Sequence, residues 1–460
     1  MKNDKDGGWS AMRKIDCQQL YSTVLSSGTY EPWHVGEHGV SKFSLEGSVI
    51  EGAFSLGKRI ATHEENARWC AAVKKSLRDS KASAKLKLFL KSHKEAGQVS
   101  CRAVHACPAF KFEALSRWVM MKLRQALVPA THLIKSSDAV VSMLRDVVVP
   151  RKLFLIKMDI KDFYVVGEAH QIAEHVSRLF TSDGRSLMFD VLYFLLTNQY
   201  VSHEGITYRV NTGCGIGLLH SGDVADACFF EMVEKELGRD LSSYGILEWC
   251  RFRDDMLFLA EDVSLFKALQ CRMESLALFF ELKIEEVSCF GIRYLDLYIS
   301  RDADRLVVVP FLKDPRLSRR LSRFSAHPWS VHEAWPRRLF DLMTSLASRD
   351  DVRDECLKEI ERRLKNDDCV VPLAGRFRPK GLSLQKICSV SLWLPLGYHP
   401  WWSRTVKRAI FRINHDQGMQ HLIRCGLLVD DPVHVRIAWK NFLPCIDSLF
   451  SHQPKWLEDG

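Results

Sequence analysis

Short apolar runs along the chain predict strands. The runs at 86–90 and around 99–104 predict a hairpin with a basic tip. A run at 153–158 (Leu-Phe-Leu-Ile-Lys-Met) predicts a buried strand that ends at Asp159. The segment 294–299 predicts a further strand. We therefore expect sheet structure in the central part of the chain.

Apolar residues at helical spacing lie between these strands. They predict helices at 112–127, beyond the glycine-rich turn at 213–217, and at 265–280. This alternation of strands and helices indicates an α+β fold. We expect three regions, namely an N-terminal extension of unassigned role at 1–80, a central region at 81–300, and a largely helical region at 301–460.

Two adjacent carboxylates lie in Phe252-Arg253-Asp254-Asp255, between Trp249-Cys250 and the apolar run 256–260. This pattern predicts a hairpin with Asp254 and Asp255 at its tip. Neighbouring carboxylates raise each other's pKa, so a pair in apolar surroundings usually needs a cation, and Mg²⁺ prefers carboxylate oxygens. A lone Asp-Asp pair is nearly always a solvent-exposed turn. The metal hypothesis therefore depends on other residues.

Asp159 is the third carboxylate on which the metal hypothesis depends. Adjacent strands could bring it beside Asp254 and Asp255. Joining a 3′-hydroxyl to an α-phosphate uses one metal to lower the pKa of the hydroxyl and a second to stabilise the leaving pyrophosphate, about 3.5–4 Å apart. The sequence offers these three carboxylates no other neutralising partner. They predict a site for two Mg²⁺ ions, with Mn²⁺ as an alternative.

Composition bounds the class of protein. The chain has 460 residues and 47% hydrophobic content, which is enough for a large core. Its net charge of +9 favours polyanionic partners. The 14 cysteines form no C-x-x-C pair, which predicts reduced thiols in a nuclear or cytoplasmic protein. No apolar run reaches the ~20 residues of a membrane span, so no membrane partner is expected.

These segments resemble the palm of reverse transcriptases, in the family's order. The matching pieces are Lys94 and Arg102 in the basic hairpin, Asp159 with Tyr164 five residues on, the glycine turn, the Asp-Asp hairpin, and Tyr294-Leu295-Asp296. The segments 198–208, 213–217, 294–297 and 325–328 are similar to Penelope-like retroelement reverse transcriptases, a lineage related to telomerase. The resemblance covers roughly residues 85–345. It implies a right-hand polymerase with fingers and an antiparallel palm sheet in 81–300, and a helical thumb in 301–460.

The resemblance implies roles for individual residues. Asp159, Asp254 and Asp255 are expected as catalytic metal ligands, with the backbone carbonyl of Ile160 completing the shell. Lys94 and Arg102 are expected to grip the triphosphate, Tyr164 to exclude a 2′-hydroxyl, and Gly213 and Gly217 to let the backbone approach the templating base pair. Lys283 is a weaker candidate for the general acid. Without the resemblance, the three cations would be interpreted as solvent-exposed charges. Tyr164 would be interpreted as a core residue, and the two glycines as part of an ordinary turn.

Three features depart from the family pattern. The family has Gln just before the glycine turn and prolines after it, whereas this chain has Arg209-Val210-Asn211-Thr212 and then 218–222 without proline. Arg253 precedes the Asp pair where many relatives have a smaller or apolar residue. The GIY-YIG endonuclease motif of many Penelope-like elements is not found, so we expect the chain to use a 3′-end that another process supplies.

Two basic groups fit contact with nucleic-acid phosphates. The first is Arg316, Arg319, Arg320 and Arg323. The second is Arg404, Lys407, Arg408 and Arg412, which would share one face of a thumb helix. A solvated charged face explains the first group equally well.

The sequence therefore predicts an RNA-directed DNA polymerase of a retroelement. Its partners would be an RNA template, a DNA or RNA primer and dNTPs. Two alternatives stay open on the same fold. One is a domesticated or decayed copy that binds nucleic acid without polymerising, and the other is a maturase-like RNA-binding role.

Overall fold

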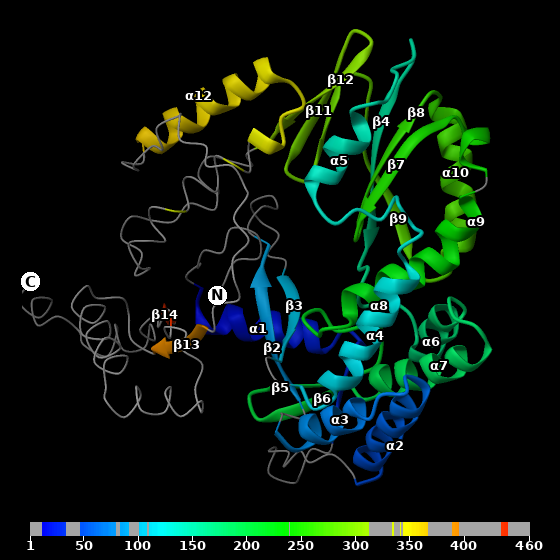
Figure 1. Ribbon diagram of the computed structural model, residues 1–460, viewed down its shortest axis with the longest axis vertical. Helices are drawn as coiled ribbons and strands as arrows, with labels where there is room; N and C mark the ends of the chain where they lie inside the picture. Colours follow the sequence, from blue (N-terminus) through cyan, green and yellow to red (C-terminus); the bar gives the residue numbers. More distant parts are fainter. Residues whose placement is uncertain are drawn as a thin grey trace, which may run out of the picture. The chain divides into compact units, whose positions relative to one another are not determined.

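The structure is a computed structural model, shown in Figure 1. It describes residues 12–33, 47–79, 83–91, 101–107, 110–238, 240–311, 334, 341, 344–366, 389–394 and 434–439. The chain divides into two compact units, Met1–Arg319 with Leu346–Arg349, and Arg320–Ser345 with Asp350–Gly460. Among the described residues, no helix has both the length and the apolar character to cross a membrane.

The central sheet of the first unit is antiparallel. Its strands are β4 (Phe154–Lys161), β7 (Ile246–Phe252), β8 (Asp255–Ala260) and β9 (Glu281–Ser288), in the order β7-β8-β4-β9. Each strand pairs antiparallel with its neighbours. Its antiparallel pairing matches what the sequence resemblance implies for the palm, so we call it the palm sheet, and the α+β class is confirmed.

Both faces of the palm sheet are covered. Ile156, Met158 and Ile160 of β4 belong to the main core. That core is completed by α4 (Glu113–Ala126), α6 (Ala169–Ser177), α7 (Ser182–Thr197), α8 (Ser221–Phe229), η1 (Phe230–Glu234), α9 (Lys235–Leu237) and α10 (Val263–Leu276). Leu155, on the opposite face, packs in a second core with α5 (Ser137–Leu144) and the sheet of β10 (Gly291–Tyr294), β11 (Leu297–Asp302) and β12 (Arg305–Pro310). Because successive strand residues point to opposite faces, Lys157, Asp159 and Lys161 share the face of Leu155.

The predicted basic hairpin is part of a larger fingers sheet. Its strands are β2 (Ala84–Leu90) and β3 (Cys101–Ala106), which pair antiparallel. The sheet also contains β1 (Tyr30–Pro32), β5 (Tyr200–His203) and β6 (Ile206–Val210), in the order β1-β6-β5-β2-β3. Helix α1 (Lys14–Leu25) packs Tyr21, Val24 and Leu25 onto this sheet. Residues from the N-terminal extension therefore help to build the fingers sheet.

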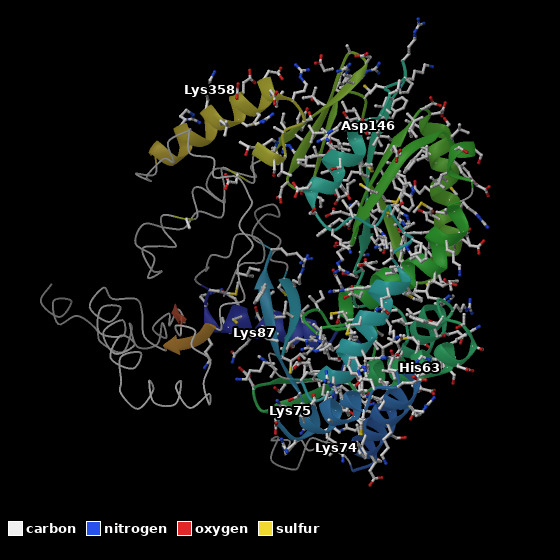
Figure 2. The ribbon with its side chains drawn as sticks, in the orientation of Figure 1. His63, Lys74, Lys75, Lys87, Asp146 and Lys358 are labelled. Atoms are coloured by element: carbon white, nitrogen blue, oxygen red, sulfur yellow. The ribbon has the colours of Figure 1, made fainter. Side chains whose placement is uncertain are left out.

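Two further N-terminal helices, α2 (Gly47–His63) and α3 (Arg68–Asp79), contribute to the main core. Ala53, Leu56, Ile60 and Val73 are buried there together with palm residues. Figure 2 labels Lys74 and Lys75 on α3, and the neighbouring Val73 is buried. The segment 47–79 thus shares its core with the palm.

Three sequence predictions of elements differ from the structure. The strand predicted at 294–299 is wrong, because Leu295 adopts the left-handed region (φ 52°) in a hairpin turn between β10 and β11. The strand predicted to end at Asp159 continues to Lys161, since Ile160 and Lys161 still pair with β9. The helix predicted to reach 280 ends at Leu276, and Leu278 has a φ of 45°.

The described elements of the second unit are α12 (Asp350–Asn366) and a parallel pair, β13 (Ser389–Leu394) and β14 (His434–Trp439). The thumb helix predicted at 404–412 lies outside the described residues.

Candidate active site

The Asp-Asp turn joins β7 to β8, as the sequence predicts. Phe252 pairs with Asp255, so Arg253 and Asp254 form a two-residue turn. Arg253 is in the left-handed region with a φ of 58°. The Ile160 N–H donates a 2.9 Å hydrogen bond to the carbonyl oxygen of Asp254. The turn is therefore tied to β4 directly beside Asp159.

The three predicted carboxylates meet at this point. Asp159 lies opposite Asp255 in the register of β4 and β8. Side chains opposite each other on antiparallel strands have Cβ atoms about 4.5–5.5 Å apart and point to the same face. Burial, and after it the charges of Asp254, Glu285 and Asp255, together raise the pKa of Asp159 to about 6. The structure thus brings Asp159, Asp254 and Asp255 together at one end of the palm sheet.

A lysine and a fourth carboxylate complete the site. Lys157 Nζ lies 2.7 Å from Glu285 Oε2 and 3.6 Å from Asp255 Oδ1. The expectation that no other partner neutralises the three Asp residues is therefore wrong. The alternation of β4 could have indicated Lys157, which is two residues before Asp159. Glu285 could not be found from the sequence, because a bulge between Lys157 and Met158 shifts the register of β9.

The donor set fits a hard divalent cation. All three Asp residues offer carboxylate oxygens, which Mg²⁺ prefers, and the charges of Asp254, Glu285 and Asp255 add to the effect of burial in raising the pKa of Asp159. In the part of the chain that the structure describes, no three His, Cys, Asp or Glu side chains form a preformed metal shell. The carboxylates are therefore neighbours whose side chains would converge on binding a cation.

Tyr164 follows β4 and packs against the main core, with the charge of Asp254 acting on its hydroxyl. Its ring is partly buried against the main core and makes an edge contact with Phe163 at 5.3 Å between centroids. Burial raises the pKa of the Tyr164 hydroxyl to about 12, and the charges of Arg253, Asp254, Asp226 and Arg102 also act on it. The partly buried ring is compatible with a packing role in the core, and its role as a gate against a 2′-hydroxyl stays a prediction.

Of the two predicted fingers cations, Arg102 is described and lies on β3. Arg102 pairs with Phe89, and because alternate residues share a face, it lies on the side of Lys87, which Figure 2 labels on β2. The charge of Arg102 acts on the Tyr164 hydroxyl and lowers the pKa of that group slightly against the larger effect of burial. Lys94 lies outside the described residues. In the palm itself, the exposed Lys283 lies opposite Asp159 on β9.

The glycine turn packs against protein backbone on two sides. A Cβ on Gly213 (φ 64°) would lie 2.4 Å from the carbonyl oxygen of Tyr164, and one on Gly217 (φ 106°) would lie 2.9 Å from that of His105. A Cβ on Gly215 would meet the His105 ring. These contacts explain the glycines without a nucleic acid, so their role toward the templating base pair stays a prediction.

A buried glutamine holds this turn. Gln199 Nε2 donates to the carbonyls of Gly213 (2.9 Å) and Leu196 (3.1 Å), and its Oε1 accepts from the Gly215 N–H at 2.8 Å. The sequence lacks the family's Gln before the turn, but Gln199, just before β5, contacts the turn in space.

The basic groups Arg316, Arg319, Arg320, Arg323, Arg404, Lys407, Arg408 and Arg412 lie outside the described residues.

Comparison with known proteins yields structural likeness only, because no family model and no curated protein matches the chain. Telomerase from Candida albicans, in complex with a TWJ fragment of telomeric RNA, is similar with a TM-score of 0.45 and 13% identity, over 64% of this chain and 55% of that one. Apo telomerase from Candida tropicalis has a TM-score of 0.45 and 14% identity, over 79% and 65% of the chains. The RNA-dependent RNA polymerase of a human picobirnavirus has a TM-score of 0.41 and 14% identity, over 77% and 74%. The chain thus spans about half to two thirds of these telomerase chains, and its function has to be inferred from the site itself.

Proposed function

We propose that this chain is an RNA-directed DNA polymerase, which adds nucleotides to a 3′-end on an RNA template. The observation that supports this most directly is the register that sets Asp159 opposite Asp255, with the Asp254 carbonyl bonded to Ile160. Two-metal nucleotidyl transfer needs carboxylates from neighbouring strands in this arrangement. The finer assignment, to a Penelope-like retroelement, rests on the sequence resemblance.

Mg²⁺ bound at this site would lower the pKa of the 3′-hydroxyl and stabilise the leaving pyrophosphate. Asp159 and Asp254 are the proposed principal ligands, with Asp255 and the Ile160 carbonyl beside them. Arg102 and Lys94 would bind the triphosphate, since a guanidinium and an ammonium suit phosphate oxygens. Lys283, exposed opposite Asp159, would donate a proton to the pyrophosphate.

Primer extension tests the proposal. Wild-type protein should extend a DNA or RNA primer on an RNA template with dNTPs and Mg²⁺. Asp254→Asn should abolish extension and leave RNA binding intact, because it removes a ligand without changing the side-chain volume. Glu236→Gln, at an exposed carboxylate on α9, is the matched control and should extend normally. RNA binding without any extension by wild type would favour the decayed-copy or maturase-like alternative.

Variants of Tyr164 test whether this residue makes the protein select dNTPs over ribonucleotides. Tyr164 comes five residues after Asp159, as the gate residue does in the family that the sequence resembles, so Tyr164→Val should incorporate ribonucleotides more readily than wild type. Tyr193→Val, at an exposed ring on α7, is the control and should keep the wild-type preference for dNTPs. Unchanged dNTP/NTP selectivity in Tyr164→Val would move the gate role to another residue, with neighbouring Phe163 the first to test.

A further inference from the structure

A fully buried guanidinium, that of Arg251, lies next to the turn between β7 and β8 that carries the proposed metal ligand Asp254. The Arg251 side chain is 0% exposed and binds Glu234, which is also 0% exposed, through two hydrogen bonds of 2.6 and 3.0 Å. Its Nη1 donates to Asp226 Oδ1 at 2.8 Å. The guanidinium also lies over the rings of Phe163 and Phe229, at 5.5 and 5.2 Å from their centroids. All of these partners fix Arg251 in one position.

Arg251 holds the turn by its backbone. The same Nη1 donates a 2.9 Å hydrogen bond to the carbonyl oxygen of Arg253, the residue in the left-handed region just before Asp254. A non-glycine residue keeps this conformation only where its surroundings hold it there. The buried guanidinium provides such a restraint one residue away from the proposed ligand.

Asp226 holds the turn by a side chain. Its Oδ1 accepts from Arg251, and its Oδ2 accepts from Arg253 Nη1. Asp226 lies on α8, which begins shortly after the glycine turn. One carboxylate on α8 therefore binds both the arginine below the turn and the arginine within it.

The network is poorly explained as a device for stability. Arg251 and Arg253 face Asp226 and Glu234, and His132 Nε2 lies 3.1 Å from Glu234 Oε2. Burying such ion pairs is costly, and apolar side chains of similar size are often as stabilising. Arg251 bonds to the backbone of the turn, and Asp226 to the Arg253 side chain within it. What they determine most directly is the position of residues 253–255 relative to α8.

We propose that Asp226 and Arg251 are positioning residues, which hold the Asp254–Asp255 turn against β4 from α8. This inference rests on the proposed function, because it assigns the carboxylates to metal binding. It goes further by linking them to the helix that follows the glycine turn. A shift of α8 would then move Asp254 relative to Asp159, so that metal binding would respond to this helix.

Gly222→Ala offers the sharpest test. A Cβ at Gly222 on α8 would lie 2.8 to 3.1 Å from the guanidinium atoms of Arg253, so alanine should displace that side chain from Asp226. The helix itself favours alanine over glycine, so the fold should persist. Arg251→Met is less useful, since it leaves Glu234 buried with only His132 beside it and would destabilise the fold.

Two measurements follow the turn without any nucleotide. Hydrogen exchange at the Ile160 amide reports its bond to the Asp254 carbonyl, and Mn²⁺ titration followed by electron paramagnetic resonance reports metal affinity. We expect Gly222→Ala to exchange faster at Ile160 and to bind Mn²⁺ at least fivefold more weakly than wild type. Arg124→Met removes another ion pair of α8, with Asp223, and is the matched control that should behave like wild type.

A double-mutant cycle checks that Asp226 and Arg253 act through each other. Asp226→Asn and Arg253→Met should each weaken Mn²⁺ binding, and the double variant should be no weaker than the more affected single variant. Additive losses would overturn the inference, and so would Ile160 exchange and Mn²⁺ affinity matching the Arg124→Met control in Gly222→Ala. A wild-type protein that binds Mn²⁺ but extends no primer would refute the proposed polymerase, while these readouts would still decide the positioning role.

Discussion

At Asp159, a proton and a metal ion compete for the same carboxylate. Burial and three neighbouring carboxylates raise its pKa from 3.8 to about 6, so the folded protein keeps a proton that the unfolded chain loses near pH 4. Without divalent metal, the free energy of unfolding should therefore fall as pH rises from about 4 to 6, and the fall should be smaller in Asp159→Asn. Urea denaturation of both proteins across this range measures the difference.

The same competition predicts how metal affinity depends on pH. Below pH 6 the metal must displace the proton of Asp159, so apparent Mn²⁺ affinity should rise up to about tenfold per pH unit and level off above 6. Because the carboxylates interact, the midpoint belongs to the cluster as a whole. A Mn²⁺ affinity that is flat between pH 5 and 7 would contradict this account.

Lys157 is expected to weaken metal binding, since its ammonium lies beside Asp255 and Glu285. Two unit charges about 4 Å apart interact by roughly 1 kcal/mol in a water-like dielectric, and a divalent ion and a unit charge by about twice that, so Lys157→Met should bind Mn²⁺ at least about fivefold more tightly. Lys161→Met is the matched control, because Lys161 lies on the same face of β4 but pairs with the exposed Glu281. Equal affinities in both variants would show that Lys157 does not compete with the metal.

At the residue scale, the sequence indicates those active-site residues that strand alternation or adjacency along the chain makes recognisable. Asp254 and Asp255 are marked by the apolar runs around them, and Asp159 by the strand before it. Glu285 is hidden by the bulge in β9. Asp226 is hidden because its partners Arg251 and Arg253 come from another element, and nothing in the local sequence announces that contact.

Among the elements, the glycine turn depends on Gln199 for its conformation. Gln199→Ala would remove three hydrogen bonds and leave the Gly215 N–H without its partner in a buried position. Leaving a buried polar group unsatisfied costs about 1–3 kcal/mol, so the free energy of unfolding should fall by that amount. Thermal and urea denaturation measure it. Gln125→Ala, at an exposed position on α4, should change stability by less than ~0.5 kcal/mol.

The elements that the sequence predicts well are those with strong apolar patterns. Helix α4 and the β7–β8 hairpin match their predicted places within a few residues. The β10–β11 turn was missed because Tyr294 to Ile299 is apolar at alternate positions and reads as one strand. The three-residue β1 was missed because its pairing with β6 spans a long stretch of chain and leaves no local signal.

For the whole molecule, the N-terminal helices are expected to be required for folding. Ile60 on α2 is 0% exposed in the core that it shares with the palm, so Ile60→Ala should cost about 2–5 kcal/mol. Ile15→Ala on α1, where the side chain is 58% exposed, is the control and should be nearly neutral. Circular dichroism during urea denaturation measures both. Normal stability of Ile60→Ala would show that residues 47–79 fold separately from the palm.

The network of Asp226, Glu234, Arg251 and Arg253 also bears on how such a chain can change over generations. Losing Arg251 or Glu234 alone leaves a charge in the interior without its main partner, whereas losing these two together leaves Asp226 paired with Arg253. Drift at these four positions should therefore proceed by paired replacement. Among descendants of this sequence, those that keep a working turn should either retain all four residues or exchange them two at a time.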